Sequence, residues 1–404
     1  MTGARGSRPD PRAGTPRRVL LRLLAGAVLV VAGAAVYGTA AATSSGAPAG
    51  SAWRWMLPKG FPQPRVPKAN PMNAAKVEVG RRLFYDTRLS ANDTQSCGSC
   101  HRQELAFTDG RATAIGATGQ SHPRNSQSLA NVAYNATLTW ANPALVTLER
   151  QMEVPLFGEN PVEMGVTDAN QARVLSRVRR DDWYARRFPR AFPGRQRPIT
   201  WTTIIRSIAA FQRSMIAADS RYDRYLRGKA GLSTAETRGM NLFMGERAEC
   251  HHCHGSFIFN DQATYVGAAV EPPAFHNTGL YNLGGTGAFP EPNRGVFEVT
   301  GRRADMGRFR APSLRNVALT APYMHDGSIA TLAEVVDHYA SGGRVIRDGP
   351  LAGDGRTNRY KDPLISGIEL SDRDRADLVA FLGTLTDRTL VTDPRFSDPF
   401  RRTP

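Results

Sequence analysis

All four cysteines of the chain lie in two Cys-X-X-Cys-His motifs, residues 97–101 and 250–254. This spacing is typical of covalent c-type haem attachment, in which two thiols add to the haem vinyl groups and the next histidine binds the iron. Two disulfides would not explain a histidine after each second cysteine, and a zinc site would not explain two distant motifs. The motifs therefore predict two covalently bound haems c, with His101 and His254 as proximal ligands. The thioether-forming thiols are Cys97, Cys100, Cys250 and Cys253.

The rest of the sequence predicts a mainly α fold. Strand signals are few, and five segments have the apolar spacing and capping residues of helices. These segments are residues 73–85, 202–226, 233–244, 331–339 and 371–385. We therefore expect two cytochrome c-like domains, each with one covalently bound haem, long loops and little β structure.

A weak internal repeat indicates that the two domains are related. The pattern Gly-X-X-Leu-Phe occurs in the helix before each haem motif, at residues 80–84 and 239–243. A chain of 404 residues also suits two domains and a targeting segment. The predicted domains are residues 71–228 and 229–404, with the boundary between 225 and 232.

The N-terminal segment, residues 1–45, has the features of an export signal or a membrane anchor. Arg17 and Arg18 precede a nearly continuous apolar stretch, and small residues follow at 38–42. Positive charge before an apolar run directs export with the N-terminus left in the cytoplasm. The stretch is near the minimum length of a membrane span, so a cleaved signal and an anchor both remain open. Either way, we expect periplasmic, extracytoplasmic haem domains after a linker and extended segment at 46–70.

The formal net charge of the chain is +16, and part of this excess lies in the N-terminal segment. The remaining positive charge could favour an acidic partner protein, or it could be a solvated surface of no specific use. No basic module with interleaved aromatic residues is visible, so nucleic acid is not an expected partner.

Several phrases of the sequence resemble the bacterial di-haem cytochrome c peroxidase and MauG superfamily. Residues 309–327 read FRAPSLRNVALTAPYMHDG, which resembles its hallmark, and residues 275–279 and 125–131 support the match. Further phrases resemble the MbnH-like branch, whose members look like enzymes that oxidise a tryptophan of a partner protein. These phrases are residues 53–58, 60–62, 70–72, 148–151, 161–163 and 305–309.

The resemblance implies that Tyr339 is the second ligand of a six-coordinate haem in the C-terminal domain. Tyr339 follows His325 by fourteen residues, where ordinary peroxidases of the superfamily place a methionine and MauG-like proteins a tyrosine. A phenolate is a hard, anionic ligand that stabilises oxidised iron, whereas a thioether favours ferrous iron. Met306 and Met324 remain rival ligands. The histidines that spacing alone leaves as candidates are His122, His251, His252, His276, His325 and His338.

The resemblance also implies an open, peroxide-reactive haem in the N-terminal domain. The superfamily's displaceable distal histidine would lie near Ala117, where this chain has none, and we expect His122 to be a loop residue. Glu163 matches the distal glutamate that moves a proton during O–O cleavage. Gln151 matches a distal glutamine, and Pro155 would limit access to the iron.

Two further sites follow from the same resemblance. Trp140 matches the tryptophan that lies between the haems and carries electrons from one to the other, although a lone tryptophan is more often a core residue. A Ca²⁺ ion would be bound by the side chain of Asn125 and by the backbone carbonyls of Thr320 and Pro322, with water completing the oxygen shell.

Three functions remain open at this stage. A MauG/MbnH-like enzyme would use H₂O₂ to form a charge-shared bis-Fe(IV) state and oxidise a residue, with tryptophan expected, of a docked partner protein. A classical di-haem peroxidase would remove H₂O₂ with electrons from a small redox protein, and Tyr339 argues against it. A non-enzymatic electron carrier would have both irons doubly ligated, which the matches at Glu163 and Gln151 oppose.

Overall fold

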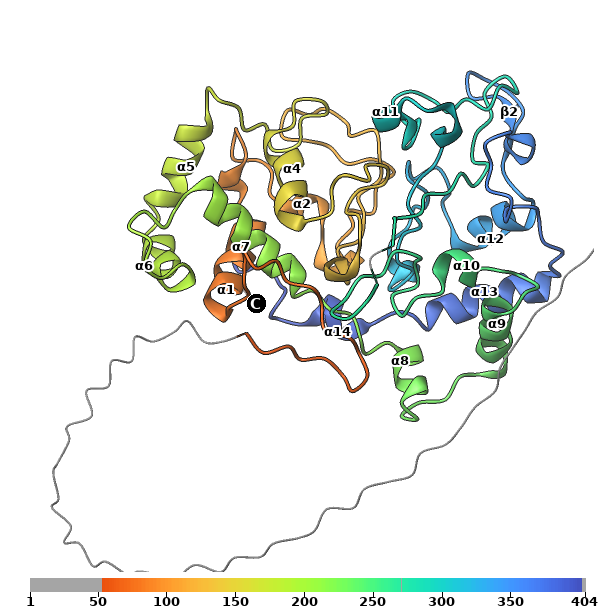
Figure 1. Ribbon diagram of the computed structural model, residues 1–404, viewed down its shortest axis with the longest axis horizontal. Coiled ribbons are helices and arrows are strands. Elements are labelled where there is room, and N and C mark those ends of the chain that lie inside the picture. Colours follow the sequence, from red (N-terminus) through yellow and green to blue (C-terminus); the bar gives the residue numbers. More distant parts are fainter. Residues whose placement is uncertain (1–52, 270, 402–404) are drawn as a thin grey trace, which may run out of the picture. The chain divides into compact units, whose positions relative to one another are not determined.

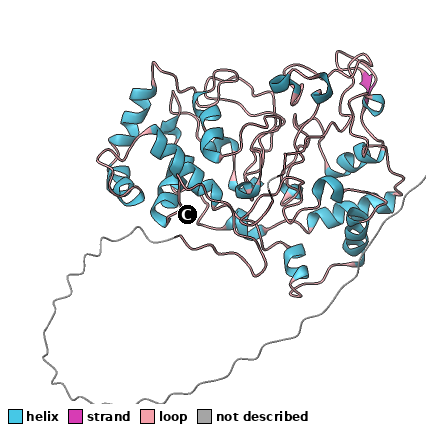
Figure 2. Ribbon diagram, viewed as in Figure 1, coloured by secondary structure: helices cyan, strands magenta, loops and turns pink. Residues whose placement is uncertain are grey.

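Short helices joined by long loops make up most of the residues that the computed structural model describes, 53–269 and 271–401 (Figure 2). Figure 1 labels many of the helices, whose bounds are α1 (Ala74–Tyr85), α2 (Cys97–Cys100), α3 (Leu148–Gln151), α4 (Glu153–Phe157), α5 (Gln171–Arg179), α6 (Asp182–Ala191), α7 (Trp201–Arg213), α8 (Arg221–Leu226), α9 (Thr234–Met244), α10 (His251–His254), α11 (Phe297–Thr300), α12 (Leu332–Ala340), α13 (Asp372–Gly383) and α14 (Arg388–Thr392). Short 3-10 helices occur at Thr87–Leu89, Gln103–Leu105, Val132–Tyr134, Arg303–Asp305, Val317–Leu319 and Gly355–Thr357. In the described part of the chain, the sheet is a single antiparallel pair, β1 (Val345–Ile346) and β2 (Gly353–Asp354). The predicted mainly α fold with long loops and little β structure is confirmed.

Four of the five predicted helices form within one or two residues of their expected ends, as α1, α9, α12 and α13. The side chain just before each of these helices caps its N-terminus. Asn73 accepts a hydrogen bond from the backbone N–H of Lys76, and Ser233 and Glu236 form a capping box at α9.

The single helix predicted over residues 202–226 is wrong. The structure has two helices there, α7 and α8, separated by residues 214–220. In this gap the backbone N–H of Ala217 donates to Asn131 Oδ1 (2.8 Å), and those of Ala218 and Asp219 donate to Asp387 Oδ2 (2.9 Å each). Side chains from distant segments therefore satisfy the N–H groups that a continuous helix would have paired.

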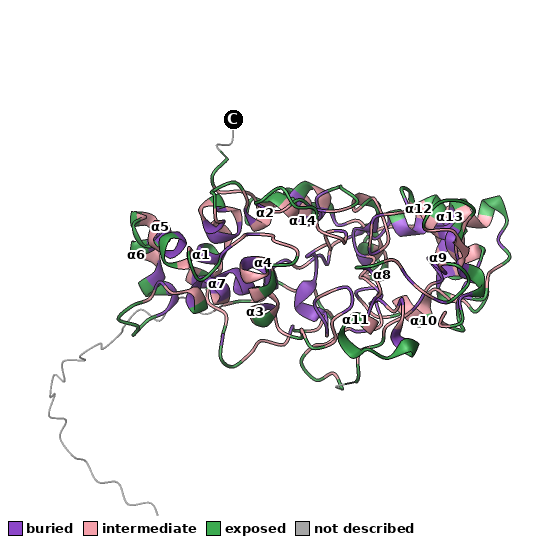
Figure 3. Ribbon diagram, turned by 90° about the horizontal axis from the view of Figure 1, so that it is seen from above, coloured by how far each residue is buried: buried purple, intermediate pink, exposed green. Residues whose placement is uncertain are grey.

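The internal repeat corresponds to a close helix crossing that occurs twice. α1 packs against α7, and a Cβ built at Gly80 would lie 1.9 Å from the carbonyl oxygen of Ser207. α9 packs against α13, and a Cβ at Gly239 would lie 1.9 Å from the carbonyl oxygen of Asp377. Only glycine permits such close contact, and α7 is buried along most of its length (Figure 3). The repeated glycine thus sets the same helix pair in each half of the chain.

The buried apolar residues form one cluster in each half of the chain and a third cluster that contains residues of both, among them Trp140 and Phe309. α1, α5, α6 and α7 supply nearly half of the first cluster, and α9 and α13 supply nearly half of the second. Leu390 and Phe396, from the C-terminal end of the chain, nevertheless belong to the first cluster. Gln103 Nε2 fixes this return by donating to the carbonyl oxygens of Leu390 and Asp393 (2.9 Å each). The predicted domain boundary between residues 225 and 232 stays a prediction. The predicted C-terminal domain, residues 229–404, included the segment around Leu390 and Phe396, which packs in the first cluster.

The predicted signal or anchor at residues 1–45, and part of the linker after it, lie outside the described residues. Within the described part, the structure contains no helix with the length and apolar character of a membrane span.

Candidate active site

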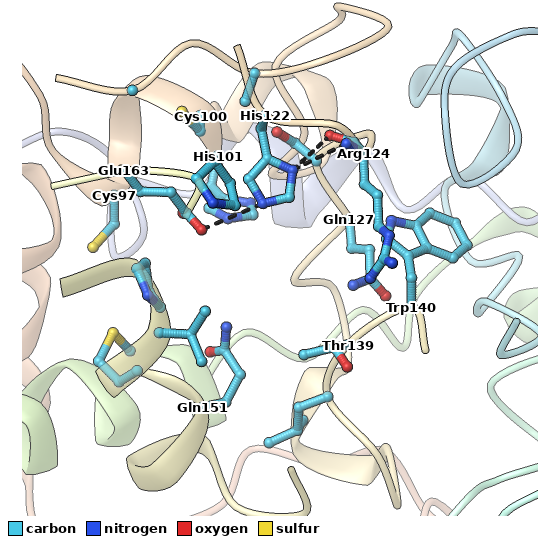
Figure 4. A pocket seen from close by; sticks show the side chains of 18 of the residues that line it. Cys97, Cys100, His101, His122, Arg124, Gln127, Thr139, Trp140, Gln151 and Glu163 are labelled. Carbon is cyan, nitrogen blue, oxygen red and sulfur yellow. Dashed lines mark hydrogen bonds and ion pairs between the residues drawn. The ribbon is translucent and has the colours of Figure 1, made fainter. Parts of the chain in front are cut away.

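Each Cys-X-X-Cys-His motif opens onto its own cavity. The first cavity has a volume of about 500 Å³ and is lined by Cys97, Cys100 and His101 (Figure 4). The second, of about 210 Å³, contains Cys250, Cys253 and His254 in its wall. All four cysteines are unpaired, so the disulfide alternative has no support. Both pairs of thiols face a space in which a bound group could be attached.

The two motif histidines are held in the same way. His101 Nδ1 lies 2.7 Å from the carbonyl oxygen of Phe107, and His254 Nδ1 lies 2.9 Å from that of Phe259. Both phenylalanines have positive φ angles, 65° and 57°, which turn their carbonyl groups toward the imidazole rings. A carbonyl acceptor places the proton on Nδ1 and leaves Nε2 for a metal. Burial lowers the pKa of both histidines, so both are held neutral, as an iron ligand must be.

The predicted residues for peroxide cleavage all line the first cavity. Gln151 comes from α3, Pro155 from α4, and Glu163 from the loop after α4. Ala117 N–H donates to the carbonyl oxygen of Glu163 (2.7 Å) and fixes this loop against a second one. A Cβ at Gly116 would lie 1.8 Å from the carbonyl oxygen of Val162, so the two loops can approach this closely only because residue 116 is glycine.

His122 also lines this cavity. The sequence predicted only that His122 is a loop residue, and did not place it at the site. Its Nε2 lies 3.5 Å from Glu163 Oε1, and Figure 4 shows the two side chains together. His122 Nδ1 lies 3.0 Å from the backbone nitrogen and 3.2 Å from the carbonyl oxygen of Arg124, and these contacts hold the ring beside the carboxylate. Glu163 thus has an imidazole beside it, and the Glu163 and His122 side chains remain partly exposed, at 34% and 26%.

Trp140 lines both cavities. Its side chain is buried, with Nε1 donating to the carbonyl oxygen of Asn125 (2.9 Å). Its own carbonyl oxygen accepts a hydrogen bond from the backbone N–H of Arg310 (2.8 Å). These bonds fix the indole in the wall that the two cavities share.

The second cavity brings together several candidate iron ligands: Tyr339, His325, Met324 and His276. His276 is already occupied, because its two ring nitrogens lie 2.6 Å from carboxylate oxygens of Asp261 and Asp362. Met306, a predicted rival, is not among the residues that line this cavity. Burial raises the pKa of Tyr339, so the phenol stays protonated unless a metal ion or another cation stabilises the phenolate.

His325 and Arg310 are two buried groups of this cavity that the sequence reasoning did not assign. The His325 ring stacks on Phe309 at 3.6 Å, and its Nε2 has no hydrogen-bond partner among the described residues. Arg310 Nη1 is likewise unpartnered in that part of the chain, and burial lowers the pKa of this guanidinium to about 10. An acidic group such as a haem propionate would satisfy both, so these residues fit a haem in the second cavity.

A backbone hydrogen bond joins the segment of Asn125, one predicted calcium ligand, to the segment that follows Thr320 and Pro322, the other two. The backbone N–H of Asn125 donates to the carbonyl oxygen of His325, and Asn125 Nδ2 donates to that of Arg111 (2.8 Å each). Asn125 Oδ1 has no hydrogen-bond donor among the described residues, so it is free to bind a cation. Thr320 and Pro322 lie a few residues before His325, and their role as ligands stays a prediction.

Comparisons with known proteins agree with this geometry. Residues 74–231 match the family model of the di-haem cytochrome c peroxidases. The chain is 32% identical to methylamine utilization protein MauG of Methylorubrum extorquens, over 82% of this chain and 83% of that protein. It is 33% identical to cytochrome-c peroxidase IdrP1 of a Pseudomonas species, over 93% of this chain and 96% of that protein. The crystal structure of a MauG-like protein associated with microbial copper homeostasis is 58% identical, with a TM-score of 0.86, over 87% of this chain and 100% of that chain.

Proposed function

Because the chain belongs to the di-haem cytochrome c peroxidase family, and is therefore a haem oxidoreductase of the peroxidase type, we propose that it uses H₂O₂ to oxidise a residue of a partner protein. Its mainly α fold of two cytochrome c-like domains is that of this family. The oxidised residue is a tryptophan, and the oxidising equivalents are shared between the two haems as a bis-Fe(IV) state before they reach the partner.

The placement of Trp140 carries this proposal. One buried indole lines both cavities, so it would offer electrons a path between haems bound in them. An electron carrier with two independent haems would not need Trp140 between a cavity with acid–base residues and a cavity with Tyr339. The two cavities therefore act as one unit, in which peroxide reacts at the first and oxidising power is stored at both.

The chain's own residues supply the proton chemistry. The haem iron provides redox chemistry when it is bound. Glu163 is placed to take the proton from one peroxide oxygen and return it to the other, which lets water leave. The His122 imidazole lies 3.5 Å from the Glu163 carboxylate, where it would help to orient this group. Gln151 offers an amide donor to the departing oxygen, and Pro155 adds an apolar wall.

Both haems are held covalently in the proposed enzyme, through the cysteines of the two motifs. The neutral, oriented imidazoles of His101 and His254 support this, as do the four unpaired thiols at the cavity walls. We assign Tyr339 as the second ligand of the haem held by His254, because an anionic ligand stabilises highly oxidised iron. One Ca²⁺ at Asn125, Thr320 and Pro322 completes the proposed cofactor set.

The partner is a protein that docks outside the cavities. A protein side chain can lose an electron to the second haem without entering a cavity of about 210 Å³. The 58% identical structure is that of a protein associated with microbial copper homeostasis, which leads us to propose a partner in the same process. We further propose a periplasmic location, on the basis of the export-like segment at residues 1–45.

The test adds one equivalent of H₂O₂ to the purified diferric protein and follows visible, near-infrared and Mössbauer spectra. We expect two Fe(IV) signals and a near-infrared band in the wild type. In Trp140→Phe the band is lost although both haems remain attached, whereas the control Trp183→Phe, on α6, keeps it. A diferric protein that is inert toward H₂O₂ would refute the proposal.

A classical peroxidase is the second candidate, and one observation favours it. Met324 lines the second cavity together with Tyr339, so a thioether is within the same pocket. Methionine ligation would make the second haem an acceptor for electrons from a small redox protein. In that case the diferric protein reacts with H₂O₂ only after one haem has been reduced.

A further inference from the structure

Three metal-binding side chains gather on the surface beside the second haem motif. His251 and His252 are the two variable residues of that motif, on α10, and Glu246 lies just after α9, a helix that Figure 1 shows near α10. One donor atom from each residue lies within 4.8 Å of the other two. None of the three lines the haem cavities described above.

The geometry of these side chains is convergent. His251 Nε2 and His252 Nε2 each lie 3.6 Å from a carboxylate oxygen of Glu246, one from Oε1 and the other from Oε2. Neighbouring side chains on a helix normally point about 100° apart. Here the ring centroids are only 4.3 Å apart and the rings are inclined by 32°. Both imidazoles therefore turn toward the same carboxylate.

The turn between α9 and α10 brings the carboxylate to the histidines. The backbone N–H of Glu249 donates to the carbonyl oxygen of Gly245 (3.0 Å), and that of His252 donates to the carbonyl oxygen of Glu249 (3.2 Å). Glu249 has a positive φ of 53°, which reverses the chain at this point. The backbone thus fixes the distance between Glu246 and the motif.

The three donors are not used by other groups of the described chain. Arg247, the cation next to Glu246 in sequence, pairs with Asp374 (2.5 Å), so the ion-pair partners of Glu246 within the described residues are the two histidines. His251 Nδ1 is buried and has no hydrogen-bond partner there. Glu246 and His252 are exposed, at 79% and 37%, so an ion can reach them from solvent.

We propose that Glu246, His251 and His252 bind a divalent transition-metal ion, and that Cu²⁺ binds most tightly. Two imidazoles and one carboxylate form a ligand set that holds such ions and leaves positions for water. Imidazole suits copper, nickel and zinc, and for a given nitrogen and oxygen site Cu²⁺ stands above Zn²⁺ in affinity. One carboxylate and two neutral rings also leave net positive charge on the bound site.

A bound cation would influence the second haem. His251 and His252 lie between Cys250 and Cys253, the residues that hold this haem in the proposed enzyme. Positive charge beside a haem favours the reduced form, which carries one positive charge less. Filling the site is therefore expected to raise the reduction potential of the second haem and leave that of the first nearly unchanged.

The experiment titrates the purified di-haem protein with Cu²⁺ in the presence of a competing chelator, and records EPR spectra and the potential of each haem. We expect one Cu²⁺ per chain, with nitrogen hyperfine structure from two imidazoles. Glu246→Gln and His252→Gln should each weaken binding at least tenfold. Glu246 lies outside the haem motif, so its variant tests the site even if a change at His252 disturbs haem attachment.

The matched control is Glu369→Gln, an exposed glutamate without an ion-pair partner among the described residues, which should bind Cu²⁺ like the wild type. Binding that is equal in wild type, Glu246→Gln and His252→Gln would overturn the site. A copper signal without nitrogen ligands would do the same. Displacement of Cu²⁺ by an equimolar amount of Zn²⁺ would refute the preference for copper.

Discussion

Replacing Glu163 with glutamine separates catalysis from stability. Glutamine has nearly the same shape but cannot take the proton from peroxide. A positioned acid–base group contributes about 10²–10⁴-fold to a rate, which corresponds to about 3–5 kcal/mol in activation free energy. Glu163 is 34% exposed and its His122 partner lies 3.5 Å away, so the pair contributes at most about 1 kcal/mol to stability. We therefore expect a large loss of rate with little change in unfolding.

The assay is stopped-flow absorbance of the diferric protein mixed with H₂O₂, together with thermal unfolding of the same samples. The control is Glu153→Gln, on α4, because Glu153 pairs with the exposed Arg150 and does not line the first cavity. Glu153→Gln should react like the wild type. If Glu163→Gln reacted within threefold of the wild-type rate, another group would move the proton, and His122 would be the first to test.

Three further predictions concern the helix crossing, the second iron ligand and a buried ion pair. Gly239→Ala should lower the free energy of unfolding by about 1–3 kcal/mol, because the added methyl group would lie 1.9 Å from a carbonyl oxygen. The control Gly383→Ala has open space around the added methyl group and should raise the free energy of unfolding slightly. Chemical denaturation measures both changes. Tyr339→Met should raise the potential of the second haem and make the diferric protein unreactive until it is reduced, as potentiometry and peroxide mixing would show. Asp223→Asn should cost about 3–5 kcal/mol, because it leaves Arg315 buried without its two carboxylate contacts at 2.8 and 2.9 Å. Burial works to raise the pKa of Asp223, but the bonds to Arg315 outweigh this effect and hold the pKa below 3.8. The stabilisation by the ion pair is therefore complete above pH 3.8 and is lost as the pH falls through the lowered pKa of the native state. Unfolding curves at low pH should show this loss in the wild type and not in Asp223→Asn.

The parts of the fold that could be predicted are those encoded by neighbouring residues. Each haem motif is contiguous, and each capped helix begins at a side chain next to it in sequence, as at Ser233. The break after α7 depends instead on Asn131 and Asp387, which are far away in the chain. No local pattern reports such partners, so the sequence predicted one helix where there are two.

The same distinction applies to the site. Trp140, Glu163 and Tyr339 were chosen by resemblance, and nothing in their spacing says that they line cavities with the two motifs. His122 was predicted to be a loop residue, but its nearness to Glu163 was not predicted, because that nearness arises from two loops that meet at Gly116. Contacts between loops depend on the folded chain, and loops have no periodicity that could reveal them.

The two halves share a proximal design and differ on the side where the iron would act. In both halves a glycine sets the helix crossing, and a phenylalanine carbonyl with positive φ orients the motif histidine. The first cavity then adds Glu163 and His122, both partly exposed. The second adds Tyr339 in a buried setting that disfavours a free phenolate. In the proposed enzyme, Glu163 would therefore assist peroxide cleavage at the first haem, and Tyr339 would stabilise highly oxidised iron at the second. The buried indole of Trp140, which lines both cavities, would let the two haems share the oxidising equivalents.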